Sequence, residues 1–287
     1  MAGKTCIVTG ATNGIGEVTA QALAGMGATV VGVGRSQAKC SETANRIKAL
    51  NRDASIEFMV ADLSNQAQVR GLAEAIKRKH SHIDVLVNNA GGYFAARQLS
   101  VDGIEMSWAL NHLSYFLLTN LLLDVIKSSA PARIVNVSSG AHTGARQIKL
   151  DDTGFATGYG TGWPAYNQSK LANILFTFEL ARRLQGSGVT ANVLHPGFVA
   201  TGFGLNNSGL MRIGMKVAQK VAARSPEKGA ETSIYLATSP EVEGVSGRYF
   251  QDKHEATPSA IAQDAEAARQ LWQLSEEQTG LRLPVAG

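Results

Sequence analysis

Short runs of apolar, mostly β-branched residues alternate along the chain with longer segments of helical periodicity. The runs predict seven strands, at 5–9, 28–33, 56–60, 85–87, 133–137, 190–194 and 248–250. The segments between them predict helices at 16–25, 37–50, 66–79, 103–128, 164–185 and 226–237. Strands that are apolar throughout and joined by helical crossovers are typical of a parallel sheet covered on both faces. We therefore expect a doubly wound α/β fold with a seven-stranded parallel sheet.

Two segments interrupt this alternation. Residues 154–162 form a glycine-rich loop, and residues 197–224 contain no predicted strand. Loops at the carboxyl ends of strands bind ligands in open α/β sheets, so we expect both segments to line a site. Residues 258–280 carry apolar positions at helical spacing and predict a terminal helix that packs on the body. No linker or repeat divides the sequence, which indicates one domain over residues 1–287.

Composition narrows the possible partners. The 287 residues are 44% hydrophobic, and 27 basic against 23 acidic residues leave a net charge of +4. The basic residues are scattered, without the clustered footprint of a nucleic-acid binder, so we expect no nucleic-acid partner. Cys6 and Cys40 are too few for a disulfide framework, and neither they nor the histidines have metal-site spacing. We expect no metal and a reducing compartment, the cytoplasm.

The longest apolar run, residues 115–126, predicts a buried helix rather than a membrane span. It includes Asn120 and Asp124 and is shorter than the ~20 residues that cross a bilayer. The first predicted strand begins at Thr5, which leaves no room before it for a signal peptide or an anchor. The sequence thus predicts no membrane span.

A glycine turn joins the first predicted strand to the first helix. Backbone N–H groups and the helix dipole at such a junction can hold a pyrophosphate. The spacing G-x-x-x-G-x-G differs from the dinucleotide pattern G-x-G-x-x-G, and a purely structural turn is the alternative. Its position at the first strand–helix junction favours a phosphate site. The residues of this candidate site are Gly10, Thr12, Asn13, Gly14, Ile15 and Gly16.

The end of the second predicted strand indicates which dinucleotide is bound. NAD enzymes usually place an acid there for the ribose 2′-hydroxyl, whereas NADP enzymes offer an arginine to the 2′-phosphate. Here the strand is followed by Arg35, and no acidic residue occurs before Glu42. A guanidinium can bind the phosphate in a bidentate manner. This favours NADP(H) over NAD(H); the alternative is that Arg35 is merely solvated.

Tyr166 and Lys170 are four residues apart in the helix predicted at 164–185, so they share one helix face. A nearby ammonium favours the ionised form of an acidic group, and we expect it to bring the phenol, with its usual pKa near ~10, towards neutrality. Such a phenol can exchange a proton with a carbonyl or alcohol oxygen. Tyr-x-x-x-Lys alone is common, and a surface pair is the alternative interpretation.

Context distinguishes these interpretations. The glycine turn, the stretch Asn88–Gly91, Asn111, the pair Ser138–Ser139 and the Tyr166/Lys170 pair occur in this order. Together they resemble the short-chain dehydrogenase/reductase family, over essentially the whole chain. The text around residues 133–139, 169–176 and 195–197 looks most like the branch of retinol dehydrogenases and WW-domain oxidoreductases. The resemblance implies a single Rossmann-type domain.

The resemblance also implies roles for matching positions. Tyr166 would be the catalytic acid/base, and Lys170 would lower its pKa and bind the nicotinamide ribose. Ser139 would bind the reacting oxygen, with Ser138 as the alternative, and Asn111 would hold a water that links Lys170 to solvent. For the coenzyme, the family pattern gives Asp62 and Leu63 at the adenine, Asn89, Ala90 and Gly91 on the adenosine side, and Pro196, Gly197, Val199 and Thr201 at the nicotinamide amide and phosphates.

The implied function is an NADP(H)-dependent oxidoreductase that interconverts a carbonyl and an alcohol. Apolar residues within 197–224 predict a lid over a small to medium hydrophobic substrate, although ordinary core contacts would give the same pattern. Tyr93, Phe94 and Trp163 are further candidates for the pocket. Family members often pair through their two long helices, which is consistent with a homodimer or homotetramer, and a monomer, as in other members of this branch, is the alternative.

Two other functions remain as alternatives. A non-catalytic NADP-binding regulator would not need the complete Ser/Tyr/Lys set. An epimerase or dehydratase of the same superfamily normally has another glycine spacing and a larger C-terminal domain than the roughly ninety residues after His195 provide. The loop 154–162 is longer and richer in glycine than is usual in the family, and the absence of a membrane-anchoring segment would argue against a membrane-dissolved substrate.

Overall fold

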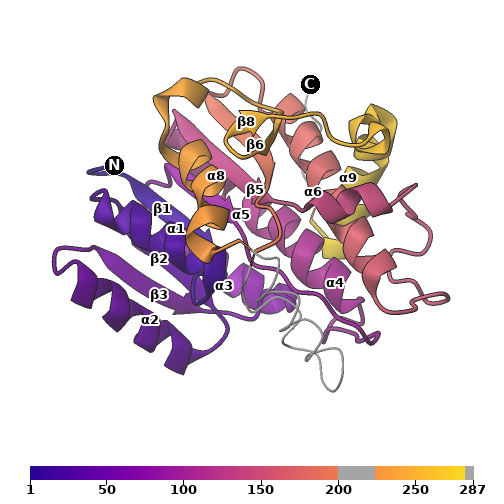
Figure 1. The fold of residues 1–287 in the computed structure, drawn as a ribbon, viewed down its shortest axis with the longest axis horizontal. Helices are drawn as coiled ribbons and strands as arrows, with labels where there is room; N and C mark the ends of the chain where they lie inside the picture. Colours follow the sequence, from indigo (N-terminus) through magenta and orange to yellow (C-terminus); the bar gives the residue numbers. More distant parts are fainter. Residues whose placement is uncertain (200–223, 282–287) are drawn as a thin grey trace.

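The computed structural model describes residues 1–199 and 224–281, which form one α/β domain around a central sheet (Figure 1). The sheet has eight strands in the order β3-β2-β1-β4-β5-β6-β7-β8. The strands are β1 (Thr5–Thr9), β2 (Thr29–Gly34), β3 (Ile56–Val60), β4 (Val85–Asn88), β5 (Ala132–Val137), β6 (Val189–His195), β7 (Tyr249–Gln251) and β8 (His254–Glu255). The doubly wound Rossmann-type fold is therefore confirmed.

The number of strands differs from the expected seven. β1 to β7 pair in parallel, and β8 pairs antiparallel with β7. A search for apolar runs cannot reveal β8, because this strand has only two residues and both are exposed. A tight turn produces it, in which Asp252 and Lys253 adopt φ values of 51° and 67°.

Helices cover both faces of the sheet. The described helices are α1 (Gly14–Gly25), α2 (Gln37–Leu50), α3 (Gln66–Lys79), α4 (Met106–Trp108), α5 (Ser114–Ser128), α6 (Trp163–Arg183), α8 (Pro226–Thr238) and α9 (Ala265–Thr279). One apolar core contains Leu23 of α1, Ile47 of α2 and Leu236 of α8. Another large core, on the opposite face, contains residues of α3, α5 and α6, among them Phe116 and Phe176. Each core lies on its own side of the sheet.

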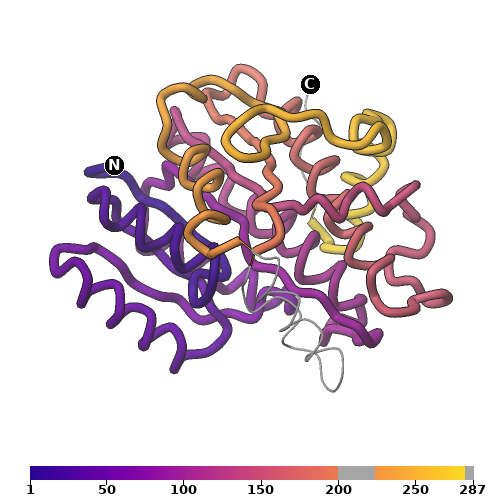
Figure 2. Tube along the Cα trace, in the orientation of Figure 1, coloured from indigo at the N-terminus to yellow at the C-terminus, as the bar shows by residue number. Residues whose placement is uncertain are grey.

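The chain trace shows how the two halves of the sheet are made (Figure 2). The early strands β1, β2 and β3 extend to one side, and the chain then returns to add β4 to β7 on the other side of β1. The order of strands thus reverses between β1 and β4. In open α/β sheets ligands bind in the crevice outside the carboxyl ends of the strands at such a reversal.

The helix predicted over 103–128 begins later and is not regular. Gly103 has a φ of +76°, and Glu105 caps the first turn by accepting hydrogen bonds from the backbone N–H groups of Ser107 and Trp108, at 2.9 and 2.8 Å. A π-helical turn, Ala109–Leu113, joins α4 to α5. Such turns often occur at functional sites, and this one carries Asn111.

One helical stretch among the described residues, Met106–Ser128, is long and apolar enough to cross a membrane. Of its apolar window, 72% is buried inside the protein. Phe116, Leu117 and Leu122 of this stretch lie in the core beneath the sheet. Such burial is typical of a core helix.

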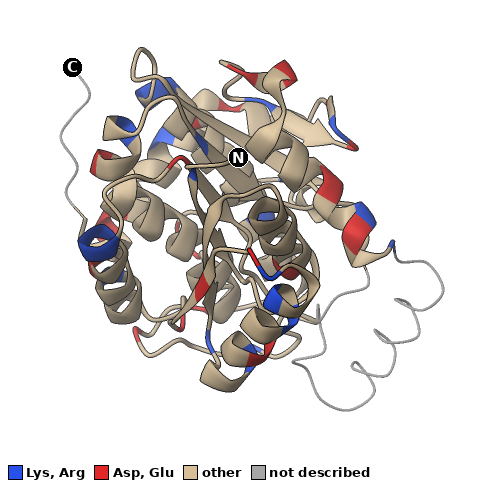
Figure 3. Ribbon diagram, turned by 90° about the vertical axis from the view of Figure 1, so that its left-hand side faces the viewer, with Lys and Arg blue, Asp and Glu red and all other residues tan. Residues whose placement is uncertain are grey.

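Charged residues of both signs are interspersed along the helices and loops (Figure 3). Several pairs link neighbouring turns of one helix and are exposed, such as Lys228 with Glu231 on α8 at 2.9 Å. Glu179 of α6 is different, because its carboxylate is buried and accepts hydrogen bonds from both Arg182 and Arg183. The pair Arg182–Arg183 therefore balances a buried acid.

The terminal segment folds as a short 3₁₀ turn, Ala260–Gln263, followed by α9, rather than as one helix over 258–280. Asp264 caps α9, accepting hydrogen bonds from the N–H groups of Glu266 and Ala267. α9 packs against α6, and the Trp272 ring lies 5.0 Å from that of Phe116 and 5.8 Å from that of Phe176. The helix completes the core on that side of the sheet.

We expect Trp272→Ala to lower the free energy of unfolding by about 3–5 kcal/mol, because it removes a buried indole from an aromatic cluster and leaves a cavity. Urea unfolding followed by circular dichroism measures this change. Trp272→Phe, which keeps a ring in the cluster, is the matched control and should lose clearly less. A loss below about 1 kcal/mol for the alanine variant would contradict this role of α9.

We also expect acid to destabilise the fold through His112. This imidazole is buried in the π-helical turn, with Nε2 2.9 Å from Ser275 Oγ of α9, and burial lowers its pKa to about 3. An unfolded histidine titrates near ~6.5, so below that pH the unfolded chain binds the additional proton. Stability should be complete above about 6.5 and fall by about 2 kcal/mol between pH 7 and pH 5 for this one group.

Urea unfolding at pH 7 and pH 5 tests this expectation. His112→Gln should reduce the loss between the two pH values, whereas the exposed His82→Gln should leave it unchanged. An equal loss in the wild type and in His112→Gln would refute the assignment to His112.

Candidate active site

The glycine turn after β1 is shaped for close approach of the backbone. Gly10 and Gly14 have φ values of 67° and 56°. A Cβ atom on Gly16 would lie 2.3 Å from the Gly10 carbonyl oxygen and 2.4 Å from Asn89 Nδ2. Asn13 is the N-cap of α1, but its side chain forms no capping hydrogen bond in the part of the chain described. The first N–H groups of α1 therefore lie at a turn that requires glycine.

This turn is tied to the end of β4. Asn89 Nδ2 donates to the Thr9 carbonyl oxygen at 2.8 Å, and the N–H groups of Asn89 and Ala90 donate to Thr9 Oγ1 at 2.9 and 3.0 Å. The structure thus brings the stretch Asn89–Gly91 beside the glycine turn. A Cβ atom on Gly91 would lie 3.5 Å from Lys170 Nζ, so the same stretch also borders the Tyr/Lys pair.

Arg35 and Asp62 follow neighbouring strands, β2 and β3, at the same edge of the sheet. Arg35 is exposed and precedes Ser36, the N-cap of α2. Asp62 Oδ1 accepts hydrogen bonds from the N–H and the hydroxyl of Ser64, at 2.9 and 2.7 Å, and Leu63 beside it is buried. The Asp62 carboxylate therefore accepts hydrogen bonds within its own loop, whereas the Arg35 side chain is exposed to solvent.

Lys170 is buried at the end of β5, next to Gly91. Its ammonium is buried and donates to the carbonyl oxygen of Val137, at the end of β5, at 3.1 Å. The nitrogen is also 5.8 Å from the ring centres of both Tyr115 and Tyr166. Burial disfavours the charged form and lowers the pKa of Lys170 to about 7. The ammonium is thus close to two aromatic rings.

The pKa of Tyr166 corrects one expectation. From the sequence, Lys170 is expected to bring the phenol towards neutrality. Instead, burial raises the pKa of Tyr166 to about 12, and the hydrogen bond with the Ser139 hydroxyl opposes this rise. The physical reason is that the phenolate would be desolvated, while the ammonium faces the phenol ring and donates to Val137. The phenol is therefore protonated at neutral pH.

The two serines after β5 have different environments. Ser138 is buried, and its hydroxyl donates to the Lys170 carbonyl oxygen at 2.7 Å. Ser139 is partly exposed, accepts a hydrogen bond from the Ala141 N–H at 3.2 Å and is hydrogen-bonded to Tyr166. Ser139 is thus the serine that faces the phenol, and Ser138 anchors α6.

Asn111 is fully buried in the π-helical turn. Its amide accepts from the Gly92 N–H at 2.8 Å and donates to the Gly92 carbonyl oxygen at 3.0 Å and to Ser169 Oγ at 2.9 Å. The side chain therefore fixes the backbone just after Gly91 and the helix turn between Tyr166 and Lys170. The structure brings Asn111 to the predicted site.

The stretch that follows β6 borders the site next to the Ser139 loop. His195 Nδ1 accepts hydrogen bonds from the N–H groups of Gly140 at 2.8 Å and Gly197 at 3.3 Å, so it links the Ser139 loop to the turn that follows Pro196. Burial lowers the pKa of His195 to about 4, which keeps it neutral and able to accept. Val199 is buried against Gly229 of α8. Thr201 and most of the predicted lid lie outside the described residues.

An aromatic cluster borders Tyr166. The ring centre of Trp163 lies 4.7 Å from that of Tyr93 and 5.7 Å from that of Tyr166. Trp163 and Phe198 are 39% and 41% exposed, whereas Tyr93 and Phe94 are buried. Within the cluster, Tyr93 is therefore the buried ring against which the exposed Trp163 ring packs.

The glycine-rich loop holds this cluster in place. The Tyr159 hydroxyl lies 2.9 Å from both the Phe94 carbonyl oxygen and the buried Glu105 carboxylate. The Tyr93 hydroxyl donates to the Thr161 carbonyl oxygen. Gly162 has a φ of +84°, and a Cβ atom there would lie 2.0 Å from the Phe94 carbonyl oxygen. The loop 154–162 thus connects the start of α6 to the capped end of α4.

Sequence reasoning does not identify Tyr115 and His195 as site residues. Tyr115 is part of an apolar run, and nothing in the pattern distinguishes it from its core neighbours. His195 directly follows the strand predicted at 190–194, so its place at the carboxyl edge is the available signal. The fit to a dinucleotide is nevertheless supported by the start of α1. There the N-cap residue Asn13 makes no capping hydrogen bond among the described residues, which leaves the first N–H groups of the helix to a phosphate.

Comparison with known proteins agrees with this geometry. Residues 4–150 match the family model for short chain dehydrogenases. Human retinol dehydrogenase 14 is 43% identical, over 98% of this chain and 88% of that protein. A crystal structure of a Mycobacterium paratuberculosis protein has a TM-score of 0.79 and 33% identity, over 99% of this chain and 96% of that chain.

The RhlG/NADP complex of Pseudomonas aeruginosa has a TM-score of 0.68 and 28% identity, over 91% of this chain and 97% of that chain. The relative and the family model both extend over the glycine turn, Asn111 and Ser139. The chain therefore belongs to the short-chain dehydrogenase family, within its retinol dehydrogenase branch.

Proposed function

We propose that the protein is an NADP(H)-dependent oxidoreductase that interconverts a carbonyl and an alcohol on a small to medium hydrophobic substrate. The observation that carries this proposal is the arrangement of Ser139, Tyr166 and Lys170 beside Gly91 at the carboxyl edge of the sheet. A regulator that only binds the nucleotide would have no use for a hydroxyl pair aimed at a reacting oxygen. Membership of an oxidoreductase family supports the same conclusion.

Within this proposal each side chain has a separate task. The Tyr166 hydroxyl gives its proton to the substrate oxygen during reduction, and its raised pKa keeps that proton in place at neutral pH. The Ser139 hydroxyl orients the same oxygen. The Lys170 ammonium and the Asn111 amide fix the phenol's helix and the backbone after Gly91. The bound coenzyme supplies the hydride.

The preference for NADP(H) rests on Arg35. Its side chain is exposed at the end of β2, next to the N-cap of α2, where the adenosine ribose of a dinucleotide lies in this fold. A guanidinium fork there suits the oxygens of a 2′-phosphate. The RhlG structure, which holds NADP, supports this preference.

A hydrophobic substrate is supported by the exposed rings of Trp163 and Phe198. Trp163 is one helical turn before Tyr166, on the same face of α6, so a substrate that reaches the phenol would pass this ring. Large exposed aromatic rings beside a few polar groups are typical of sites for apolar ligands.

We expect Tyr166→Phe to lower kcat for reduction of aldehydes or ketones by NADPH by about 10²–10⁴-fold, because the proton donor is lost while the ring remains. Nicotinamide absorbance follows the reaction, and the KM for NADPH should stay nearly constant. Tyr235→Phe is a matched control, since its hydroxyl bonds Glu241 just after α8 and not the site. Full activity of Tyr166→Phe would show that another group donates the proton.

We expect Arg35→Asp to lower kcat/KM for NADPH by about 10–100-fold, the loss of a charge-assisted bidentate contact, and to spare NADH. Steady-state kinetics with both coenzymes and one carbonyl substrate measure the change. Arg52→Asp makes the same charge change at an exposed position after α2 and should have little effect. An equal fall in kcat/KM with NADPH and with NADH would mean that Arg35 does not bind the 2′-phosphate.

A further inference from the structure

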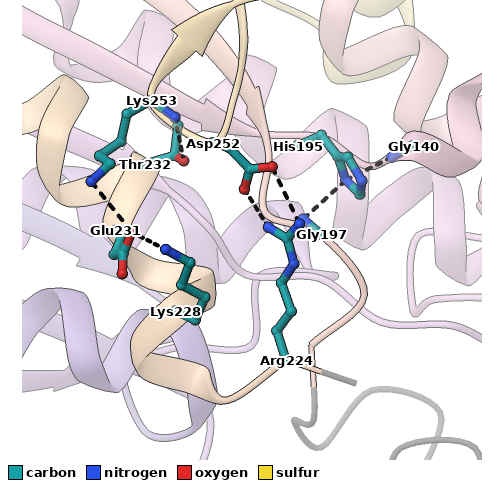
Figure 4. A network of polar contacts seen from close by, with 9 residues as sticks. All are labelled: Gly140, His195, Gly197, Arg224, Lys228, Glu231, Thr232, Asp252 and Lys253. Carbon is teal, nitrogen blue, oxygen red and sulfur yellow. Dashed lines mark hydrogen bonds and ion pairs between the residues drawn. The ribbon is translucent and has the colours of Figure 1, made fainter. Parts of the chain in front are cut away.

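An ion pair lies beside the turn that follows β6. Arg224 forms a two-pronged pair with Asp252, in which NH1 donates to Oδ1 and NH2 donates to Oδ2, the latter at 3.2 Å (Figure 4). Asp252 stands in the tight turn between β7 and β8. The pair therefore connects this hairpin to the backbone beside the proposed coenzyme site.

Arg224 also contacts that backbone directly. Its backbone N–H donates to the Phe198 carbonyl oxygen at 2.7 Å, and it pairs with Val199 in a short parallel bridge. Its side chain lies across Gly197, where a Cβ atom would be 2.9 Å from Arg224 Cδ and 3.0 Å from Nε. Gly197 has a φ of +85°, so the turn requires both the conformation and the small size of glycine.

His195 holds the opposite side of the turn at Gly197. The Gly197 N–H donates to His195 Nδ1, which accepts the Gly140 N–H as well (Figure 4). Val199 then packs on Gly229 of α8, whose Cβ position lies 3.2 Å from Ile15 Cγ1 at the start of α1. The turn is thus held between the imidazole and the guanidinium, and its far end reaches the glycine turn of β1.

We propose that Arg224 and Asp252 are positioning residues for the coenzyme. Their ion pair holds the guanidinium across Gly197, and this fixes the stretch 196–199 in the form that presents its backbone to the nicotinamide end. The inference rests on the proposed function, because it assumes that this stretch binds the coenzyme. Neither side chain takes part in proton transfer, so the expected effect is on binding and not on turnover.

The pair is suited to orienting a backbone rather than to adding much stability. The two side chains are 37% and 45% exposed, and exposed ion pairs contribute little to folding. Arg224 nevertheless lowers the pKa of Asp252, so the carboxylate is charged at neutral pH and remains available to hold the guanidinium. A planar fork on a carboxylate also fixes direction, which a lysine would not do.

The test compares Arg224→Ala, Asp252→Asn and the double variant. NADPH binding is measured by the change in nicotinamide fluorescence, and KM and kcat are measured with one carbonyl substrate. We expect each single variant to raise Kd and KM for NADPH about fivefold, with kcat nearly unchanged. The double variant should be no worse than either single one, since both remove the same contact.

Glu231→Gln is the matched control. Glu231 pairs with Lys228 and Lys253 in the same network, at 2.9 and 3.5 Å, but neither lysine crosses Gly197 in Figure 4. Its Kd should equal that of the wild type. The exchanged pair Arg224→Asp with Asp252→Arg should recover part of the lost affinity, and thermal melting should show that all variants are folded.

The outcomes separate the possibilities. If Arg224 instead bound a coenzyme phosphate itself, Asp252→Asn would free the guanidinium, and the Kd would stay constant or fall, which would overturn the proposal. Unchanged Kd values in both single variants, with a wild type that binds and turns over NADPH, would overturn it while leaving the proposed function intact. If the wild type bound no nicotinamide nucleotide, both the proposed function and the positioning role of Arg224 and Asp252 would be overturned.

Discussion

The carbonyl oxygen of Val137 is the acceptor on which the candidate site depends. A buried ammonium needs a hydrogen-bond acceptor in place of water, and this oxygen accepts from Lys170 at 3.1 Å. It is also 3.4 Å from Asn173 Nδ2 and 3.5 Å from the Tyr115 hydroxyl. β5, α5 and α6 therefore meet at one atom. The position of the phenol on α6 follows from this contact, because Tyr166 is one turn away on the same helix.

The two serines at the end of β5 have different roles: Ser138 has a structural role, and Ser139 lies at the candidate site. Side chains alternate across a strand, so Ser138 and Ser139 point to opposite sides as the chain leaves the sheet. Ser138 turns into the core and binds the α6 backbone, while Ser139 faces the phenol. His142, three residues later, accepts the Ser259 N–H and lies 2.8 Å from the Ser139 carbonyl oxygen, which ties the C-terminal segment to the same loop.

Much of this could be predicted from the sequence, because strand–helix alternation determines which residues reach the carboxyl edge. The parallel sheet and the glycine turn are found in this way, and the Tyr/Lys pair is found from its helical spacing. Asn111 and Ser139 come from the resemblance to the family. The pKa direction of Tyr166 is not, since burial is a tertiary property that helical spacing does not contain. Nor is β8, which a turn at Asp252 creates, or the support that Tyr159 gives to the aromatic cluster through Glu105.

The place of α9 has a consequence for biosynthesis. Trp272 packs against both Phe116 and Phe176, and Trp108 Nε1 donates to Gln278 Oε1 at 2.8 Å. A helix that is synthesised late therefore closes a core built from the middle of the chain. Until then those aromatic rings are accessible to chaperones. A messenger with a premature stop codon before residue 265 would yield a polypeptide that the quality-control machinery of the cell recognises as unfinished.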